Sequence, residues 1–159
     1  MPTFETQLAS VVVKNITGCT ELLEVERLSG GASQETYRLK VVLNGMATPL
    51  AMRRTPGGEY VEALPSHPGL DVEALLMQSA KAVGVPEPEV YHVLTRADDL
   101  GDGFIMEWIE GEALGARITR DPQFASIRPT LAKACGEILA RIHGIDLDQS
   151  GLRSRLAEL

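Results

Sequence analysis

The sequence predicts an α+β fold: a five-stranded antiparallel sheet with one packed helix, plus an N-terminal helix and a C-terminal linking helix. The first observation behind this prediction is the order of the segments, in which three strand-like stretches precede a helix, two further strands and a last helix. The second is that short, glycine-containing turns join the first three strands, which makes those strands antiparallel. A single helix between strands cannot cover both faces of a sheet, and this favours α+β over a doubly wound fold.

The composition is that of an ordinary globular domain. Of the 159 residues, 44% are hydrophobic and 23% are charged, as expected for one domain or one lobe of a larger protein. The formal net charge of −7 disfavours nucleic acid as a partner, because phosphate backbones bind to basic faces. We expect no membrane partner, since the sequence has neither a long apolar run nor a signal-peptide pattern. Two distant cysteines and three scattered histidines predict a reduced, cytoplasmic protein without a metal site in this chain.

In the first half of the chain, stretches with the hydrophobic periodicity of a helix or a strand are separated by residues typical of turns. Residues 4–16 predict a helix, with Thr3 placed to cap its start and Gly18 placed after its end. Strands are expected at residues 22–28, 35–43 and 48–53. Within residues 35–43 the side chains alternate: Tyr37, Leu39 and Val41 face one way, and Thr36, Arg38 and Lys40 face the other. Asn44-Gly45 predicts a tight hairpin between the second and third strands.

The second half continues the same sheet. Residues 71–83 predict a helix, 89–95 a fourth strand, and 104–109 a fifth strand apolar enough to be central. A long helix follows, from near Pro129 to Gly144, with an apolar stripe along it. We therefore divide the chain into an N-terminal helix (1–20), a lobe containing the sheet (21–111), and a linker with the first helices of a second lobe (112–159).

A glycine turn stands between the first and second strands. Gly30 and Gly31 are adjacent, so the backbone there can approach a ligand closely and direct N–H groups at phosphate oxygens, and Ser33 adds a hydroxyl donor. An ordinary hairpin would carry the same residues. The turn is neither a dinucleotide fingerprint nor a Walker-type phosphate loop, because the required glycine and lysine spacing is absent.

A small residue and a cation share one face of the third strand. Ala51 leaves room for a flat ring, and Arg53 provides charge for phosphates. Glu73 follows in the first turn of the next helix, where it can pair with Arg53 or serve only as a favourable helix-start residue. Arg54 remains an alternative ligand, and two solvated arginines at a strand end remain the structural alternative.

The fifth strand leads into a possible purine site. Alternation makes Glu107 and Ile109 point the same way, so the carbonyl of one and the N–H of the other can bind one ring, beside Met106. A plain core strand would explain the same pattern.

Taken in order, these motifs resemble the protein-kinase-like N-lobe of the aminoglycoside phosphotransferase and choline kinase-like family. The resemblance covers residues 22–151 and rests on Leu-Ser-Gly-Gly-x-Ser, Leu-Ala-Met-Arg-Arg-x-Pro-Gly-Gly, Val-Pro-x-Pro and Met-Glu-Trp-Ile-Glu-Gly. The run with two arginines is most similar to phosphotransferase domains found beside or fused to acyl-CoA dehydrogenases.

The resemblance implies ATP and Mg²⁺ as cofactors and a small-molecule hydroxyl compound as acceptor. By this resemblance, residues 30–33 would cover the phosphates and Ala51 would lie over the adenine. Arg53, paired with Glu73, would hold the α- and β-phosphates. The backbones of Glu107 and Ile109 would bind the adenine, with Met106 at the back of the pocket. The acceptor stays open between an antibiotic, choline, a sugar and a hydroxyacyl compound.

The sequence departs from the family at two points. Arginine replaces the usual lysine at position 53, which keeps the charge but changes its geometry. The His-Gly-Asp loop and the magnesium ligands of the C-lobe are not found, and His143-Gly144-Ile145-Asp146 is interpreted as a helix end. We therefore expect an ATP-binding lobe that is inactive alone and is covered by its own C-lobe or by another protein. The alternative is a non-catalytic interaction or weak nucleotide-binding module.

Overall fold

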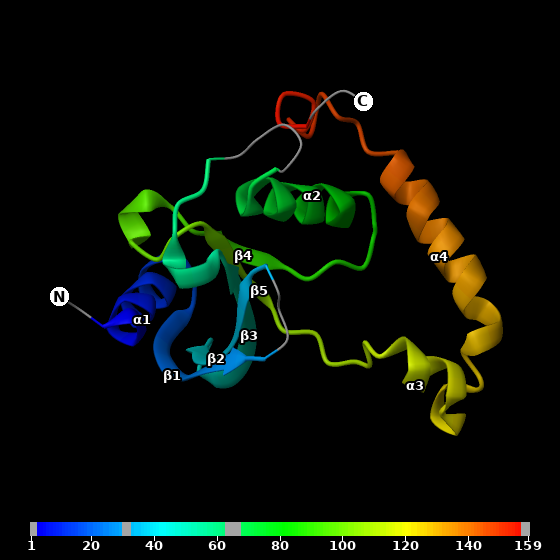
Figure 1. Ribbon diagram of the computed structural model, residues 1–159, viewed down its shortest axis with the longest axis horizontal. Coiled ribbons are helices and arrows are strands. Elements are labelled where there is room, and N and C mark those ends of the chain that lie inside the picture. The colour runs from blue at the N-terminus through cyan, green and yellow to red at the C-terminus, as the bar shows by residue number, and fades with distance from the viewer. Residues whose placement is uncertain (1–2, 30–32, 63–67, 157–159) are drawn as a thin grey trace.

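The computed structural model describes residues 3–29, 33–62 and 68–156. In chain order, its α-helices and strands are α1 (Phe4–Asn15), β1 (Cys19–Leu28), β2 (Glu35–Leu43), β3 (Met46–Arg54), α2 (Leu70–Ala82), β4 (Val90–Val93), β5 (Gly103–Glu107), α3 (Gly115–Arg120) and α4 (Arg128–His143). The strands form one antiparallel sheet in the order β1-β2-β3-β5-β4 (Figure 1). The predicted α+β fold with a five-stranded antiparallel sheet is confirmed, and β5 is an internal strand, between β3 and β4.

The first three strands follow from local sequence signals. The β2–β3 hairpin turns at Asn44 and Gly45, whose φ angles of 51° and 78° are those that a two-residue hairpin turn requires. The register then places Leu43 opposite Met46 and continues without a break to Glu35 opposite Arg54. Tyr37, Leu39 and Val41 are buried on one face, as the alternation predicts.

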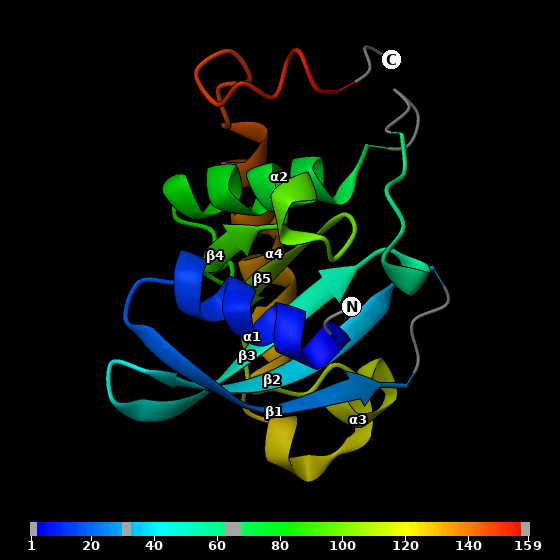
Figure 2. The same ribbon diagram turned by 90° about the vertical axis from the view of Figure 1, so that its left-hand side faces the viewer.

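The N-terminal helix belongs to the core. Thr3 caps α1, because its side chain accepts a hydrogen bond from the backbone N–H of Thr6. Leu8 and Val12 are fully buried and pack in one cluster with β2 and β3 residues such as Leu39 and Leu50. Figure 2 shows α1 crossing in front of the sheet, whereas α2 lies above β4 and β5. The two helices therefore pack on opposite faces of the sheet, and α2 reaches only the part of its face that β4 and β5 form.

Helix α2 covers the other face at the β4–β5 side. Leu70 and Ala74 of α2 are buried against Val90 and Phe104 in a second cluster. The same helix presents Glu73 in its first turn, so the packing of α2 decides where that carboxylate lies.

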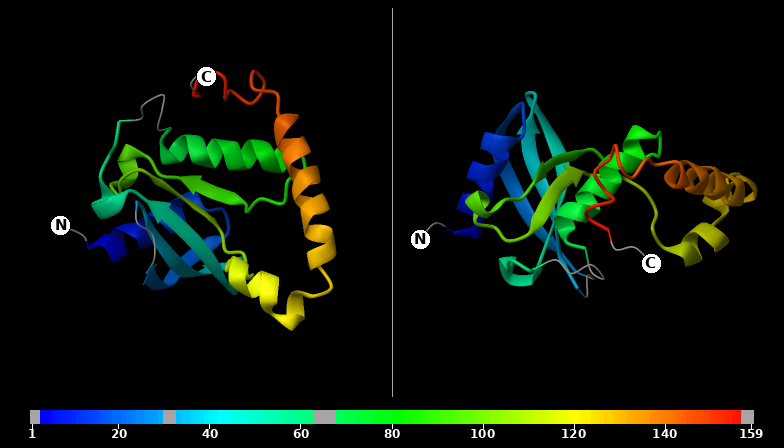
Figure 3. Two further views of the ribbon diagram at one scale, coloured as in Figure 1. Left: turned by 45° about the vertical axis from the view of Figure 1, so that its right-hand side comes forward. Right: turned by 90° about the horizontal axis from the view of Figure 1, so that it is seen from above.

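Helix α4 has the predicted position in the sequence but none of its residues is buried. It runs past the end of α2 and away from the sheet (Figure 3), and Arg141 Nη1 donates to the Gly84 carbonyl at 2.7 Å. The following segment returns over α2, where Leu152 is fully buried and Arg155 pairs with Asp71. Apolar side chains of α4 such as Leu139 and Ile142 are thus exposed, whereas β5 buries Phe104 and Ile105 completely.

Both cysteines are free thiols, with Cys19 buried and Cys135 exposed. Within the described part of the chain, no helix combines the length and the apolar character that crossing a membrane requires.

Candidate functional site

Two rows of side chains cross the face of the sheet that carries α2. Directly opposed residues of antiparallel strands point to the same face, so the register defines the rows. One row contains Glu26, Arg38, Ala51 and Met106, and the other contains Leu28, Thr36, Arg53 and Phe104. The rows are two residues apart, or about 7 Å. The second row is nearer the turn between β1 and β2, so Arg53 lies on that side of Ala51.

Arg53 is held between two side chains. Its Nη1 pairs with the carboxylate of Glu73, and its Nη2 donates to the amide oxygen of Gln34. The side chains of Arg53 and Glu73 are each 34% exposed, so the pair lies at the surface of the lobe with one side open to solvent. Sequence reasoning predicted the Arg53–Glu73 pair but missed Gln34, whose only signal was its position directly after Ser33.

The local structure explains why Glu73 meets Arg53. A carboxylate in the first turn of a helix is stabilised by the helix dipole, and α2 begins at Leu70. Leu70 and Ala74 pack on Phe104, which is the cross-strand neighbour of Arg53 in β5. The packing of α2 on β5 therefore brings Glu73 to the end of the row that contains Arg53.

Arg54 lies on the opposite face, against α1. Its Nε donates to Glu35 at 2.8 Å and its Nη2 to the Tyr37 hydroxyl at 3.1 Å. Its guanidinium carbon lies 4.2 Å from the centroid of the Phe4 ring, and its side chain is 12% exposed. The contacts of Arg54 are thus with core residues on the α1 face. Arg53 is the arginine of β3 that is oriented toward α2.

Glu35 is the buried acceptor of that core network. Burial alone would raise the pKa of Glu35, but hydrogen bonds from the Tyr37 hydroxyl, the Gly57 backbone N–H and Arg54 lower the pKa below its ordinary value. Arg27 completes the network at 2.9 Å from the other carboxylate oxygen. Glu35 is the first residue of β2, so this network fixes the end of the turn between β1 and β2.

The segment after β5 differs from the prediction. We expected the strand to continue through Ile109, but β5 ends at Glu107, opposite Leu50. The next residue of β3 is Pro49, which has no backbone N–H to donate to a sheet ladder. Ile109 is therefore exposed (58%) and lies beyond the strand.

Some of the backbone groups at the end of β5 already have hydrogen-bond partners. The N–H of Glu107 donates to the Glu89 carbonyl at 2.8 Å, and the Glu107 carboxylate accepts the Glu89 N–H at 3.1 Å. The N–H of Ile109 makes no backbone hydrogen bond to any of the described residues.

The remaining predicted site residues are placed as follows. Ser33 is exposed, and Gly30 and Gly31 lie outside the described residues. Ala51 is 5% exposed, opposite Met106, which is partly buried and packs with the α2 cluster. The structure therefore brings Ala51, Arg53, Glu73 and Met106 to one side of the sheet.

A comparison with known protein families matches most of the chain. The model of the phosphotransferase enzyme family matches residues 24–159. The chain belongs to this family. Its sheet with α2 is a kinase-like N-lobe, as the order of motifs predicted.

One relative that the chain resembles is acyl-CoA dehydrogenase family member 10 of Mus musculus. The two are 28% identical over an alignment of 155 residues, and the alignment covers 94% of the chain. The chain spans about 13% of the length of that relative.

Proposed function

We propose that this chain is the nucleotide-binding lobe of an ATP-dependent kinase that transfers the γ-phosphate to a hydroxyl group of a small molecule. The observation that carries the proposal is the position of Arg53, which Glu73 and Gln34 hold on the same sheet face as Ala51. Phosphoryl transfer depends on positioning and charge stabilisation, and a cation held by a helix carboxylate is one of its recurring parts.

Arg53 suits a phosphate ligand chemically. A guanidinium has five N–H donors in a fixed fork, and Gln34 and Glu73 engage Nη2 and Nη1. The 34% exposure of the side chain leaves part of this fork open. Arginine binds phosphate in a bidentate manner and keeps its charge at any physiological pH. Arg53 would therefore bind the α- and β-phosphates, with Gly30, Gly31 and Ser33 near them.

The base would lie one row away, under Ala51 and beside Met106. The carbonyl of Glu107 and the N–H of Ile109 would bind the purine edge. Because Ala51 is only 5% exposed, a ring at this position requires the side chains that cover Ala51 to move aside.

The metal ligands and the catalytic base would come from a second lobe. His143 is the last residue of α4, and Asp146 accepts the backbone N–H groups of Asp148 and Gln149 at 2.9 and 3.0 Å. Asp146 thus stabilises a turn, which supports the structural interpretation of this motif. We propose that Mg²⁺, which neutralises phosphate charge when bound, is held by residues outside this sequence.

The exposed apolar side chains of α4 favour one alternative, a non-catalytic interaction module. Leu139 and Ile142 are 52% and 39% exposed, and such side chains become buried when a partner packs on the helix. A kinase C-lobe would cover α4 equally well. Nucleotide binding therefore distinguishes a kinase lobe from a pure interaction module, and turnover in a protein that carries the second lobe distinguishes it from a weak nucleotide-binding module.

The test is calorimetric titration of the 159-residue chain with ATP, comparing wild type, Arg53→Ala and Arg27→Ala. Arg27 lies at the same end of the sheet but pairs with Glu35 on the other face, so it is a matched control. We expect Arg53→Ala to weaken ATP binding at least about tenfold, as for loss of a charged hydrogen bond, and Arg27→Ala to leave it unchanged. Equal affinities in all three proteins would contradict the assignment of Arg53. Turnover would be measured in a protein that also carries the second lobe.

A further inference from the structure

A cluster of three side chains links β2 to the segment after β5. The guanidinium carbon of Arg38 lies 4.9 Å from the centroid of the Trp108 ring. Arg38 Nη2 is 3.8 Å from the Glu110 carboxylate, which also accepts the indole N–H of Trp108 at 2.8 Å. Arg38 thus contacts two residues that are 70 or more positions away in the sequence: it stacks on Trp108 and pairs with Glu110. A hydrogen bond joins Trp108 and Glu110 to each other. The sequence placed Arg38 on a strand face, and Trp108 and Glu110 in a motif, but assigned none of the three a role.

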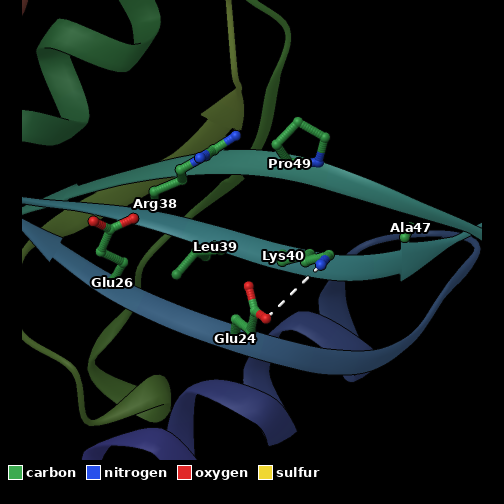
Figure 4. A pocket seen from close by; sticks show the side chains of 7 residues that line it. All are labelled: Glu24, Glu26, Arg38, Leu39, Lys40, Ala47 and Pro49. Atoms are coloured by element: carbon green, nitrogen blue, oxygen red, sulfur yellow. Dashed lines mark ion pairs between the residues drawn. The ribbon is translucent and has the colours of Figure 1, made fainter.

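The cluster lies beside the proposed base position. Arg38 is directly opposite Ala51 in the register, so both side chains are on the face that also carries Arg53. Figure 4 shows the Arg38 side chain leaving β2 and lying over β3 near Pro49, at the border of a depression of about 180 Å³. Trp108 stands directly between Glu107 and Ile109, whose backbones would bind the purine edge.

We propose that Arg38 is a positioning residue for the nucleotide base: through Trp108 and Glu110 it fixes the segment after β5 relative to Ala51. The inference rests on the proposed nucleotide-binding function and deepens it. A flat ring binds well only if the side chain of Ala51, which would lie over the ring, is held at a fixed distance from the backbone groups of Glu107 and Ile109. Beyond Glu107 no ladder hydrogen bond to β3 sets that spacing, and the Arg38 cluster takes its place.

The planar guanidinium is necessary for this role. It can stack on the indole ring and pair with a carboxylate at the same time, which an ammonium group does less well. The neighbouring cation on the same face, Lys40, offers a natural comparison. It pairs with Glu24 at the same 3.8 Å, and its side chain is 49% exposed against 45% for Arg38. Its only ion pair within the described residues is to β1, so Lys40 has no part in fixing the segment after β5.

The experiment titrates the 159-residue chain with adenosine, ATP and tripolyphosphate by calorimetry. The variants are Arg38→Ala, Arg38→Lys and the matched control Lys40→Ala. We expect Arg38→Ala to weaken adenosine and ATP binding about three- to tenfold, as for loss of a cation–π contact and a surface ion pair, without changing tripolyphosphate binding. Arg38→Lys should lose most of the same affinity, and Lys40→Ala none.

A second readout comes from Trp108, which is the sole tryptophan of the sequence. Its fluorescence should respond to adenosine in the wild type, and its emission without ligand should shift in Arg38→Ala but not in Lys40→Ala. Thermal unfolding of each variant checks that the chain is folded.

The outcomes separate two failures. If the wild type binds ATP but Arg38→Ala and Lys40→Ala bind adenosine alike, the positioning role is wrong and the nucleotide-binding function stands. An equal loss of adenosine and tripolyphosphate affinity in Arg38→Ala also overturns the role, because the effect would not be specific to the base. If the wild type binds none of the three compounds at millimolar concentration, the proposed function fails and the inference fails with it.

Discussion

Arg53 and Arg54 are neighbours in β3, yet their guanidinium groups lie on opposite faces of the sheet. Arg53 meets Glu73 of α2, and Arg54 meets Glu35 under α1. The side chains differ in exposure, 34% against 12%. One dipeptide thus supplies a partly open cation on one face and a structural cation on the other, and the two positions should respond differently to the same substitution.

We expect Arg54→Ala to destabilise the chain by about 2–4 kcal/mol, because it leaves the buried Glu35 carboxylate without its nearest cation. Arg27 still contacts Glu35, which keeps the loss below that of a fully isolated charge. Arg53→Ala should cost less than about 1 kcal/mol, since it removes a pair that is one-third exposed. Urea unfolding monitored by circular dichroism measures both. Equal losses would show that the two faces do not differ as described.

Gly101 and Gly45 provide a second comparison. Both have a positive φ, 85° and 78°, so an alanine at either position carries a backbone penalty of about 1–2 kcal/mol. A Cβ at Gly45 would meet no atom within 4 Å, whereas a Cβ at Gly101 would overlap the backbone of Gly58. We expect Gly101→Ala to destabilise by about 3 kcal/mol or more and Gly45→Ala by about 1–2 kcal/mol. Similar melting temperatures for the two variants would contradict the close approach of Gly101 to Gly58.

The pH dependence of stability should contain a contribution from Asp98. This buried carboxylate accepts hydrogen bonds from the Thr95 N–H, the Thr95 hydroxyl and His92 at 2.7, 2.9 and 3.0 Å. Burial alone would raise the pKa of Asp98, but these hydrogen bonds lower it below the ordinary value. A lowered folded-state pKa stabilises the protein above the unfolded-state pKa of about 3.9, and this stabilisation is lost as pH falls through the folded-state value.

We therefore expect Asp98→Asn to reduce the free energy of unfolding at pH 7 by about 1–3 kcal/mol, with the difference from wild type shrinking below about pH 4. Asp99→Asn is the matched control, because Asp99 is exposed and its φ of 51° suits asparagine. Urea titrations at several pH values measure the free energy of unfolding of wild type and both variants. A difference between wild type and Asp98→Asn that stays constant down to pH 2 would be incompatible with this account.

Much of the fold follows from short-range signals. The Asn44-Gly45 turn set the register of β2 and β3, and strict alternation in β2 predicted which side chains are buried. The Arg53–Glu73 pair followed from the face of β3 that Arg53 shares with Ala51 and from the place of Glu73 in the first turn of α2. The turn and the alternation depend on a residue and its near neighbours, whereas the contact between Arg53 and Glu73 also needs α2 to pack on β5.

What the sequence did not predict depends on contacts between distant segments. β5 stops at Glu107 because of its partner strand, where Pro49 comes next, and nothing in residues 104–109 themselves marks that end. Likewise, the stacking of Arg38 on Trp108 requires the sheet order to be known. The apolar stripe of α1 predicted a helix but not that α1 would cover one face of the sheet.

The exposed position of α4 leads to a last prediction, about dynamics. No residue of α4 is buried, whereas α2, of similar length, buries Leu70, Val72 and Ala74. Isolated helices of this length are marginal in water, so α4 should open far more often than α2. We expect its amide hydrogens to exchange at least about a hundredfold faster than those of α2 in hydrogen–deuterium exchange monitored by mass spectrometry. Protection of α4 equal to that of α2 would mean that its apolar side chains are covered in solution, and a concentration series would then show whether a second copy of the chain covers them.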